Sequence, residues 1–150
     1  MVEENEMAPD STFMSDKGEE IRLASFRGKK VVLYFYPKDD TPGCTKEACS
    51  FRDDYSQFTL KNVIVIGVSP DTGASHQKFR AKYSLPFHLL SDPDHEVAEA
   101  YGAWEERMVF GKIRDGILWS TFIIDEEGKI TKIFRNVTPS GRATEVLEYL

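Results

Sequence analysis

One stretch of sequence decides the fold, and it reads Val31-Val32-Leu33-Tyr34-Phe35-Tyr36-Pro37-Lys38-Asp39-Asp40-Thr41-Pro42-Gly43-Cys44-Thr45-Lys46-Glu47-Ala48-Cys49. Its first six residues form a continuous apolar and aromatic run, which predicts a buried strand. After a turn, four apolar residues at helical spacing predict a helix over about 42–60: Ala48, Phe51, Tyr55 and Phe58. The chain therefore passes from strand to turn to helix at the first of its two cysteines.

The position of Cys44 at the start of a helix has a chemical consequence. Thr41 suits the cap of this helix and Pro42 its first position. The first turn of a helix presents unpaired N–H groups and the positive end of the helix dipole, and both favour a thiolate. Such settings lower a cysteine pKa from about 8.5 to roughly 3.5–7.5. We therefore expect Cys44 to be a nucleophile, with the Thr41 hydroxyl available to the sulfur or to a substrate.

The second cysteine lies five positions further on, at Cys49. In a regular helix, two such residues are about 140° and roughly 8.7 Å apart between Cα atoms. A disulfide needs less than about 7 Å. Cys44 and Cys49 can therefore bond only if the first turns of the helix unwind, which suits a pair that bonds once per catalytic turnover better than a structural disulfide.

These residues resemble the active site of the peroxiredoxins, in the bacterioferritin-comigratory-protein or peroxiredoxin Q branch. The family pattern of proline, three residues, threonine, two residues and cysteine is matched by Pro37, Thr41 and Cys44, and the second cysteine of the branch by Cys49. The resemblance extends over nearly the whole chain through further matching segments in the order of the family: Ala8-Pro9-Asp10, Gly28-Lys29-Lys30, Phe51-Arg52-Asp53, Leu90-Ser91-Asp92 and Ser120-Thr121-Phe122-Ile123-Ile124-Asp125.

The resemblance implies a thiol peroxidase that needs no metal or organic cofactor. In such an enzyme, Cys44 would be the peroxidatic residue, attacking hydrogen peroxide or an alkyl hydroperoxide and becoming a sulfenic acid. Cys49 would be the resolving residue, and thioredoxin or a similar dithiol would reduce the resulting disulfide. Thr41 would complete the catalytic set.

One position departs from the family pattern. Peroxiredoxins of this branch carry an arginine directly before the Ser-Thr-Phe of a strand that faces the peroxidatic cysteine, and here Trp119 stands at that place. Tryptophan has a single N–H donor and no charge. Arg107 or Arg114 is a candidate substitute. We expect Cys44 to be less acidic and slower with peroxide than in family members that have the arginine.

Composition sets the class of protein. The chain has 150 residues, 41% hydrophobic and 29% charged, which are values typical of one globular domain, expected over 1–150. A net charge of −6 argues against nucleic acid and acidic membrane surfaces as partners. No apolar run approaches the roughly 18 residues of a membrane span, and the acidic start does not resemble a signal peptide. We expect a cytoplasmic protein that is a monomer or a weak homodimer.

The remaining pattern predicts an α/β protein with a thioredoxin-like fold, an N-terminal hairpin extension and an insertion around 87–117. Strands are expected over 31–36, 63–68, 87–90, 118–125 and 129–135, after a small hairpin built from 12–14 and 21–23. Helices are expected over 42–60, 72–84, around Val97–Tyr101 and from Thr138-Pro139 onward. Residues 102–117 show no clean period and are interpreted as a loop.

Less specific interpretations remain open for each site residue. Cys44 and Cys49 are also compatible with core packing, and Thr41 with a cap alone. Glu47 fits either a polar group of the site or a solvated helix charge, and the three histidines, His76, His88 and His95, read as ordinary residues without metal-ligand spacing. A different class of function is a non-catalytic, redox-responsive binding module whose surface is switched by a Cys44–Cys49 disulfide.

Overall fold

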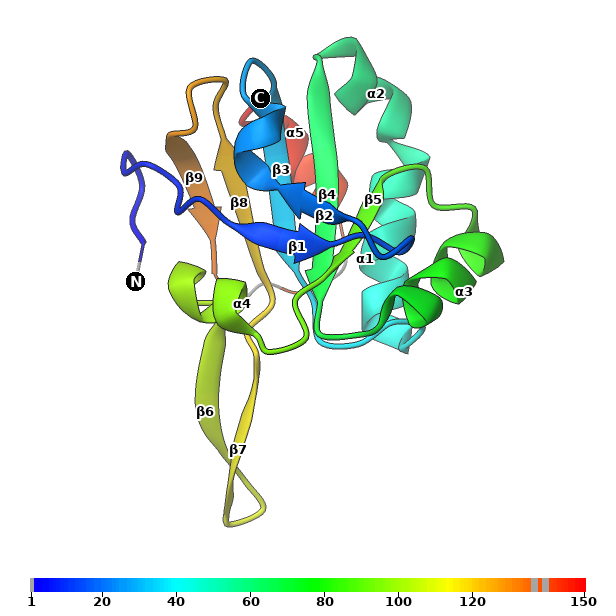
Figure 1. The fold of residues 1–150 in the computed structure, drawn as a ribbon, viewed down its shortest axis with the longest axis vertical. Helices are drawn as coiled ribbons and strands as arrows, with labels where there is room; N and C mark the ends of the chain where they lie inside the picture. The colour runs from blue at the N-terminus through cyan, green and yellow to red at the C-terminus, as the bar shows by residue number, and fades with distance from the viewer. Residues whose placement is uncertain (1, 136–137, 139–140) are drawn as a thin grey trace.

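The cysteine stretch lies at the centre of a mixed sheet. The computed structural model describes residues 2–135, 138 and 141–150, without the side chains of 107–109 and 113–115. Seven strands form the sheet in the order β2-β1-β5-β4-β3-β8-β9 (Figure 1). Their bounds are β1 Thr12–Met14, β2 Glu20–Arg22, β3 Lys30–Phe35, β4 Val63–Ser69, β5 His88–Ser91, β8 Ser120–Ile124 and β9 Ile130–Phe134.

The pairing of the central strands confirms the predicted connections. β3 and β4 run parallel, with Val32 opposite Val65, as expected for two strands joined by a helix. β8 pairs antiparallel with both β3 and β9, so the expected final hairpin is present. The N-terminal hairpin is also confirmed, with Phe13 opposite Ile21.

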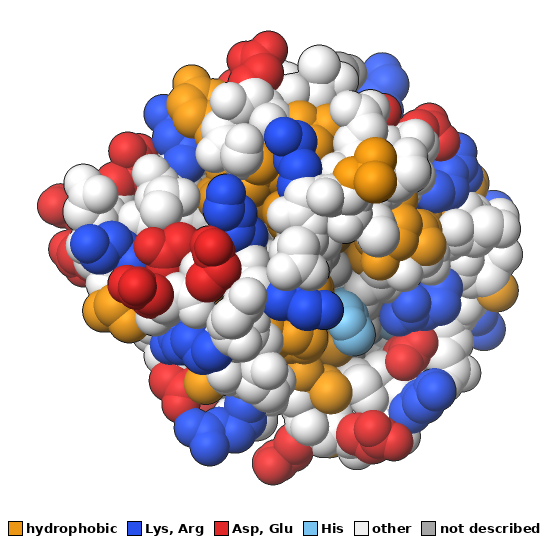
Figure 2. Space-filling model, turned by 90° about the horizontal axis from the view of Figure 1, so that it is seen from above, with side chains coloured by type: hydrophobic (Ala, Val, Ile, Leu, Met, Phe, Trp, Pro, Cys, Tyr) orange, Lys and Arg blue, Asp and Glu red, His pale blue; other side chains and the backbone are white. Residues whose placement is uncertain are grey.

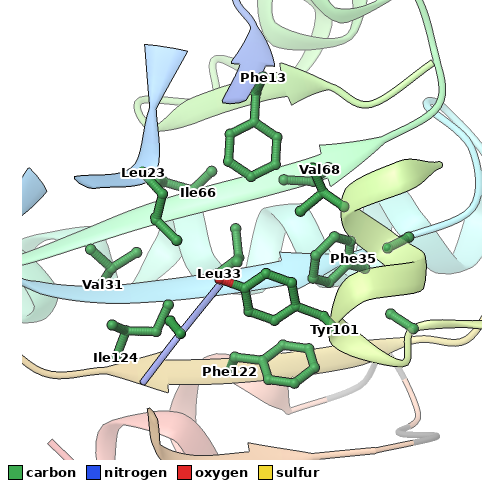
Figure 3. Close-up of a cluster of buried hydrophobic side chains, with 14 of the residues drawn as sticks. Phe13, Leu23, Val31, Leu33, Phe35, Ile66, Val68, Tyr101, Phe122 and Ile124 are labelled. Atoms are coloured by element: carbon green, nitrogen blue, oxygen red, sulfur yellow. The ribbon is translucent and has the colours of Figure 1, made fainter. Parts of the chain in front are cut away.

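Alternate side chains of β3 serve two separate cores, because successive residues of a strand point to opposite faces. Val31, Leu33 and Phe35 face a cluster that includes Phe13, Tyr101 and Phe122 (Figure 3). This face is covered by α4, Glu96–Tyr101 (Figure 1). The other face of β3 packs against a second cluster, which contains Cys44 and draws side chains from the remaining helices. These helices are α1 Pro42–Asp53, α2 Tyr55–Leu60, α3 Gly73–Tyr83 and α5 Arg142–Leu147.

The predicted helix over 42–60 is two helices. α1 ends at Asp53 and α2 begins at Tyr55, with Asp54 in a non-helical conformation between them. The apolar spacing continues through the break because both helices bury the same face, with Phe51 and Phe58 fully inside the core. The spacing of buried residues therefore did not reveal the interruption.

The prediction of a loop over 102–117 is wrong. Trp104–Val109 forms β6 and Lys112–Ile117 forms β7, and the two pair as a separate antiparallel hairpin that projects from the body of the molecule (Figure 1). The turn residues Phe110 and Gly111 both have positive φ, at 50° and 77°, as a tight two-residue hairpin turn requires. The sequence of this hairpin shows no alternating apolar pattern, so its two strands were not anticipated.

Two further boundaries differ from expectation. β5 lies within the main sheet, between β1 and β4, so the first part of the expected insertion belongs to the central fold. The last helix begins at Arg142, with Gly141 in a left-handed conformation at its cap, and not at the expected Thr138-Pro139, of which Pro139 lies outside the described residues. Among the described residues, no helix is both long enough and apolar enough to cross a bilayer.

Candidate active site

The structure brings Cys44, Cys49 and Thr41 together at the carboxyl end of β3. Both cysteines lie on α1 as free thiols, Cys44 buried with 2% of its surface exposed and Cys49 half-buried. Pro42 occupies the first turn and Thr41 the cap position, as predicted. The carboxyl ends of strands are where open α/β sheets place their reactive groups.

The Thr41 side chain does not cap the helix by accepting a hydrogen bond from it. Its hydroxyl lies 2.9 Å from the Lys38 carbonyl oxygen and is also hydrogen-bonded to the sulfur of Cys44. One hydroxyl carries one proton, so it donates to the carbonyl or to the sulfur, but not to both. Thr41 can therefore turn its proton towards Cys44 when a negative charge forms there.

The pKa of Cys44 is raised to about 11, mainly because burial penalises the charged thiolate. Hydrogen bonds from Thr41 and from the Lys38 backbone lower this pKa, while the nearby Glu47 and Asp39 carboxyls raise it. The expected lowering by the helix start is therefore wrong for this closed arrangement. The hydrogen bonds from Thr41 and the Lys38 backbone are outweighed by desolvation and by two carboxyls.

Thr41 and Lys38 belong to a loop, residues 37–41, that is tied to α3. The Asp40 carboxylate accepts hydrogen bonds from Lys82, at 2.8 Å, and from the Tyr83 hydroxyl, at 3.0 Å. Asp39 is buried and hydrogen-bonds to Ser75 and His76. His76 is fully buried within this group, so its interpretation as an ordinary residue did not anticipate its place beside the cysteine loop.

Comparisons with known proteins agree with this geometry. The model of the AhpC/TSA family matches residues 5–133. The chain belongs to the AhpC/TSA family. Among curated proteins, it is 50% identical to a putative peroxiredoxin Bcp of Coxiella burnetii over 97% of both chains. It is 46% identical to peroxiredoxin Bcp of Bacillus subtilis, over 99% of this chain and 95% of that protein.

A solved structure extends the agreement to three dimensions. The bacterioferritin comigratory protein of Xanthomonas campestris, studied for alkyl peroxide reduction, superposes with a TM-score of 0.89 at 34% identity, covering 93% of this chain and 88% of that one. The chain is thus a peroxiredoxin of the Bcp or peroxiredoxin Q branch with a thioredoxin-like fold. It is a thiol-dependent peroxidase, with a peroxide as substrate and a thiol as reductant, and the comparisons do not favour the alternative of a binding module.

Glu47 of this peroxiredoxin is a buried group, not a solvated helix charge. Only 1% of its surface is exposed, and burial raises its pKa to about 8, against the opposing effect of the Arg142 guanidinium. Arg142 is itself buried, although it lies at the start of the last helix, and nothing in the sequence distinguished it from a surface residue. The two helices meet here, since the Ala143 N–H donates to the Ser50 hydroxyl at 3.1 Å.

A set of buried polar atoms lies on the cysteine side of the sheet without a hydrogen-bond partner in the described part of the chain. These atoms are Tyr34 Oη, Glu47 Oε1, Thr121 Oγ1, Arg142 Nε and Arg142 Nη2. Tyr34 and Thr121 are directly opposite each other on β3 and β8. Such groups are costly when left unsatisfied, so the layer between the sheet and α1 is polar as well as apolar.

Trp119 occupies the place expected for the family arginine. It directly precedes β8, is partly buried, and packs against the cluster that contains Cys44. Within the described part of the chain, the groups with the largest effects on Cys44 include no cation. The suggested substitutes, Arg107 and Arg114, face each other across the β6–β7 hairpin. Their side chains lie outside what the structure describes, so the substitution is untested.

Proposed function

We propose that this peroxiredoxin reduces peroxides with Cys44 as the peroxidatic thiol and Cys49 as the resolving thiol. The observation that carries the proposal is the position of Cys44 at the start of α1, hydrogen-bonded to Thr41 and the Lys38 backbone, with a second free thiol on the same helix. The Cys44 thiolate attacks one oxygen of the O–O bond, which breaks. The other oxygen takes up a proton and leaves as water or an alcohol, and Cys44 becomes a sulfenic acid.

The second step forms a bond that the closed structure does not permit. α1 is continuous from Pro42 to Asp53, so the two cysteines are held roughly 8.7 Å apart between Cα atoms by helix geometry. The start of α1 must therefore unwind before the Cys49 thiolate can attack the sulfenic sulfur and expel its oxygen as water. An external dithiol then reduces the disulfide and restores both thiols.

Thr41 and the Lys38 backbone support the first step. The Lys38 backbone is hydrogen-bonded to the Cys44 sulfur, and the Thr41 hydroxyl can turn its proton from the Lys38 carbonyl oxygen to the sulfur when the thiolate forms; both lower the Cys44 pKa, which burial raises. A buried thiolate that keeps its two donors is less solvated than one in water, and its charge is directed at an incoming peroxide. We assign Thr41 to the catalytic set for this reason.

We propose thioredoxin or a similar dithiol carrier as the reductant, because an intramolecular disulfide is reduced by two thiols in succession. Reduction at every turnover requires a reducing compartment, which supports the cytoplasm. No nucleic acid or membrane is proposed as a partner. This choice is supported by the net charge of −6 and by the alternation of acidic and basic side chains on the face in Figure 2.

We further propose that residues 1–150 form one domain that works as a monomer or a weak homodimer. The seven-stranded sheet takes its strands from residue 12 to residue 134, so no boundary divides it in sequence. Cys44 and Cys49 lie on a single α1, and the thiol chemistry does not require a second copy.

The proposal is tested by two serine variants in a coupled peroxide-consumption assay with thioredoxin and its reductase. Cys44→Ser is expected to abolish peroxide consumption, because serine is not ionised near neutral pH. Cys49→Ser is expected to keep the first oxidation, seen as one equivalent of sulfenic acid per chain, and to lose sustained turnover. Full turnover in both variants would disprove the two assignments. A single loss of thiols without sustained turnover in the unmodified protein would favour the redox switch.

A further inference from the structure

His76 is a fully buried histidine whose two ring nitrogens both face hydrogen-bond acceptors. Nδ1 lies 2.7 Å from Asp39 Oδ2, and Nε2 lies 3.2 Å from the carbonyl oxygen of Leu90. A carboxylate and a carbonyl oxygen only accept hydrogen bonds, so the ring of His76 is placed to donate to them from α3. His76 and Asp39 thus form a buried, hydrogen-bonded pair on the cysteine side of the sheet.

Asp39 is the centre of this group. Its Oδ1 accepts from the Tyr36 hydroxyl at 2.6 Å, and its Oδ2 also accepts from the Ser75 hydroxyl at 2.8 Å. Its backbone N–H donates to Asp71 Oδ2 at 2.7 Å. The one residue is thus fixed by β3, by α3 and by the segment that follows β4. A buried carboxylate with this many donors has little freedom to move.

The fixed residue lies between the two groups that hydrogen-bond to the Cys44 sulfur. Lys38 immediately precedes Asp39, and Thr41 follows two residues later. Asp40 ties the same loop to Lys82 and Tyr83, and the Asp40–Lys82 ion pair is made by side chains 42% and 58% exposed. An exposed ion pair contributes little to stability, whereas removing one partner of a buried hydrogen bond leaves a buried polar group unsatisfied. The buried His76–Asp39 pair is therefore the main anchor of the loop.

We propose that His76 is a positioning residue that holds the Asp39 loop closed over Cys44, favouring attack on peroxide and opposing formation of the Cys44–Cys49 disulfide. The inference rests on the proposed roles of the two cysteines. Holding the loop keeps the Thr41 hydroxyl and the Lys38 backbone on the sulfur, which the first step needs. The second step needs the start of α1 to unwind, which displaces Thr41 at its cap position and pulls on the anchored loop.

The two steps therefore respond in opposite directions when the anchor is weakened. A variant with a loose loop loses part of the hydrogen bonding to the thiolate and reacts more slowly with peroxide. The same variant unwinds α1 more easily and closes the disulfide faster. A general loss of stability does not produce this pattern. It would slow both Cys44 oxidation and disulfide formation in the folded molecules, or leave both unchanged.

The test is stopped-flow oxidation of His76→Gln, which keeps a polar side chain but lacks the ring that spans Asp39 and the Leu90 carbonyl oxygen. We expect the second-order rate of Cys44 oxidation to fall about tenfold, as for the loss of a hydrogen bond to a charged group. We expect the first-order rate of disulfide formation to rise severalfold. The pKa of Cys44, measured by pH-dependent alkylation in a Cys49→Ser background, is expected to rise, and this readout does not depend on turnover.

Two further variants keep the test decisive if His76→Gln folds poorly. Ser75→Ala removes one donor to Asp39 and is expected to shift both rates in the same opposite directions, by smaller factors. Lys82→Gln, the matched control, removes only the exposed ion pair of the same loop, leaves the Tyr83–Asp40 hydrogen bond, and is expected to leave both rates within about twofold.

Several outcomes would overturn the inference. These are unchanged rates in a folded His76→Gln, a fall or rise of both rates together, or equal effects of Lys82→Gln and His76→Gln. A failure of the proposed role of Cys44 is seen separately. In that case Cys44→Ser, with His76 unchanged, would still show the oxidation phase.

Discussion

Replacing Trp119 by arginine is expected to make Cys44 more acidic and faster with peroxide. Trp119 is partly buried against the cluster that contains Cys44, at the position where the family arginine is expected. Among the described residues, the charged groups with the largest effects on Cys44 are the Glu47 and Asp39 carboxyls, and burial raises the Cys44 pKa to about 11. A guanidinium at position 119 adds a cation, and its long aliphatic stem can occupy part of the space left by the indole.

The size of the effect follows from that pKa. At pH 7, a thiol with a pKa of about 11 is ionised in roughly one molecule in 10⁴. A neighbouring cation lowers a pKa by about 1–3 units, so a shift of about 2 raises the thiolate fraction about 100-fold. The thiolate of a more acidic thiol is a weaker nucleophile, which reduces the gain in rate by roughly 8-fold. The net gain is about tenfold, and donation from the guanidinium to the peroxide oxygens adds up to about 100-fold more.

The assay uses a Cys49→Ser background, so that a single thiol remains. The pKa of Cys44 is obtained from the pH dependence of alkylation, and the second-order rate with hydrogen peroxide from stopped-flow mixing between pH 6 and 10. In the Cys49→Ser protein that keeps Trp119, the rate is expected to rise about tenfold per pH unit over this range, because the thiolate fraction of Cys44 does so below its pKa. The gain from arginine is expected to shrink as the pH approaches 11.

The matched control is Trp104→Arg, which makes the same exchange at the other tryptophan of the chain. Trp104 stacks on His95 and packs against the opposite cluster, away from Cys44. It is expected to leave the pKa and the rate unchanged. If Trp119→Arg folds and changes neither quantity, or if Trp104→Arg has the same effect, then Trp119 does not stand in the place of the arginine and another group supplies the charge.

Three further predictions concern the same layer of the molecule. Formation of the disulfide is expected to increase amide exchange across Gly43–Arg52, and equal protection in both redox states would show that the cysteines do not pair. The pKa of Glu47 is raised to about 8, so folding takes up a proton and stability is lost as the pH rises from about 4.5 towards 8. Urea unfolding of Glu47→Gln is therefore expected to show a flatter pH dependence, by up to a few kcal/mol, and an unchanged dependence would contradict the buried position. In Gly67→Ala, the new Cβ would lie 2.8 Å from the buried ring of Tyr34, so urea unfolding is expected to show a loss of about 1–3 kcal/mol; a loss below about 0.5 kcal/mol would show that the ring moves freely.

The local features of the site followed from the sequence because they depend on short-range spacing. The apolar run from Val31 to Tyr36, the turn and the helix start fix Cys44 at the carboxyl end of a strand, and the structure confirms this placement. The thioredoxin-like fold was also predictable, since the central strands are continuous apolar runs and the helices between them carry apolar residues at helical spacing. The β6–β7 hairpin was missed because its sequence shows no such pattern.

The chemical state of the site was decided by tertiary structure. The helix start alone predicts a lowered Cys44 pKa, yet the fold buries the sulfur and places two carboxyls beside it, and desolvation dominates. The meeting of His76 with Asp39, 37 positions apart, and of Arg142 with Glu47 depends on how α3 and α5 pack on the sheet. Spacing along the chain carries no information on such contacts. The sequence by itself thus determined where Cys44, the proposed peroxidatic thiol, sits, while packing set its acidity and fixed the loop beside it.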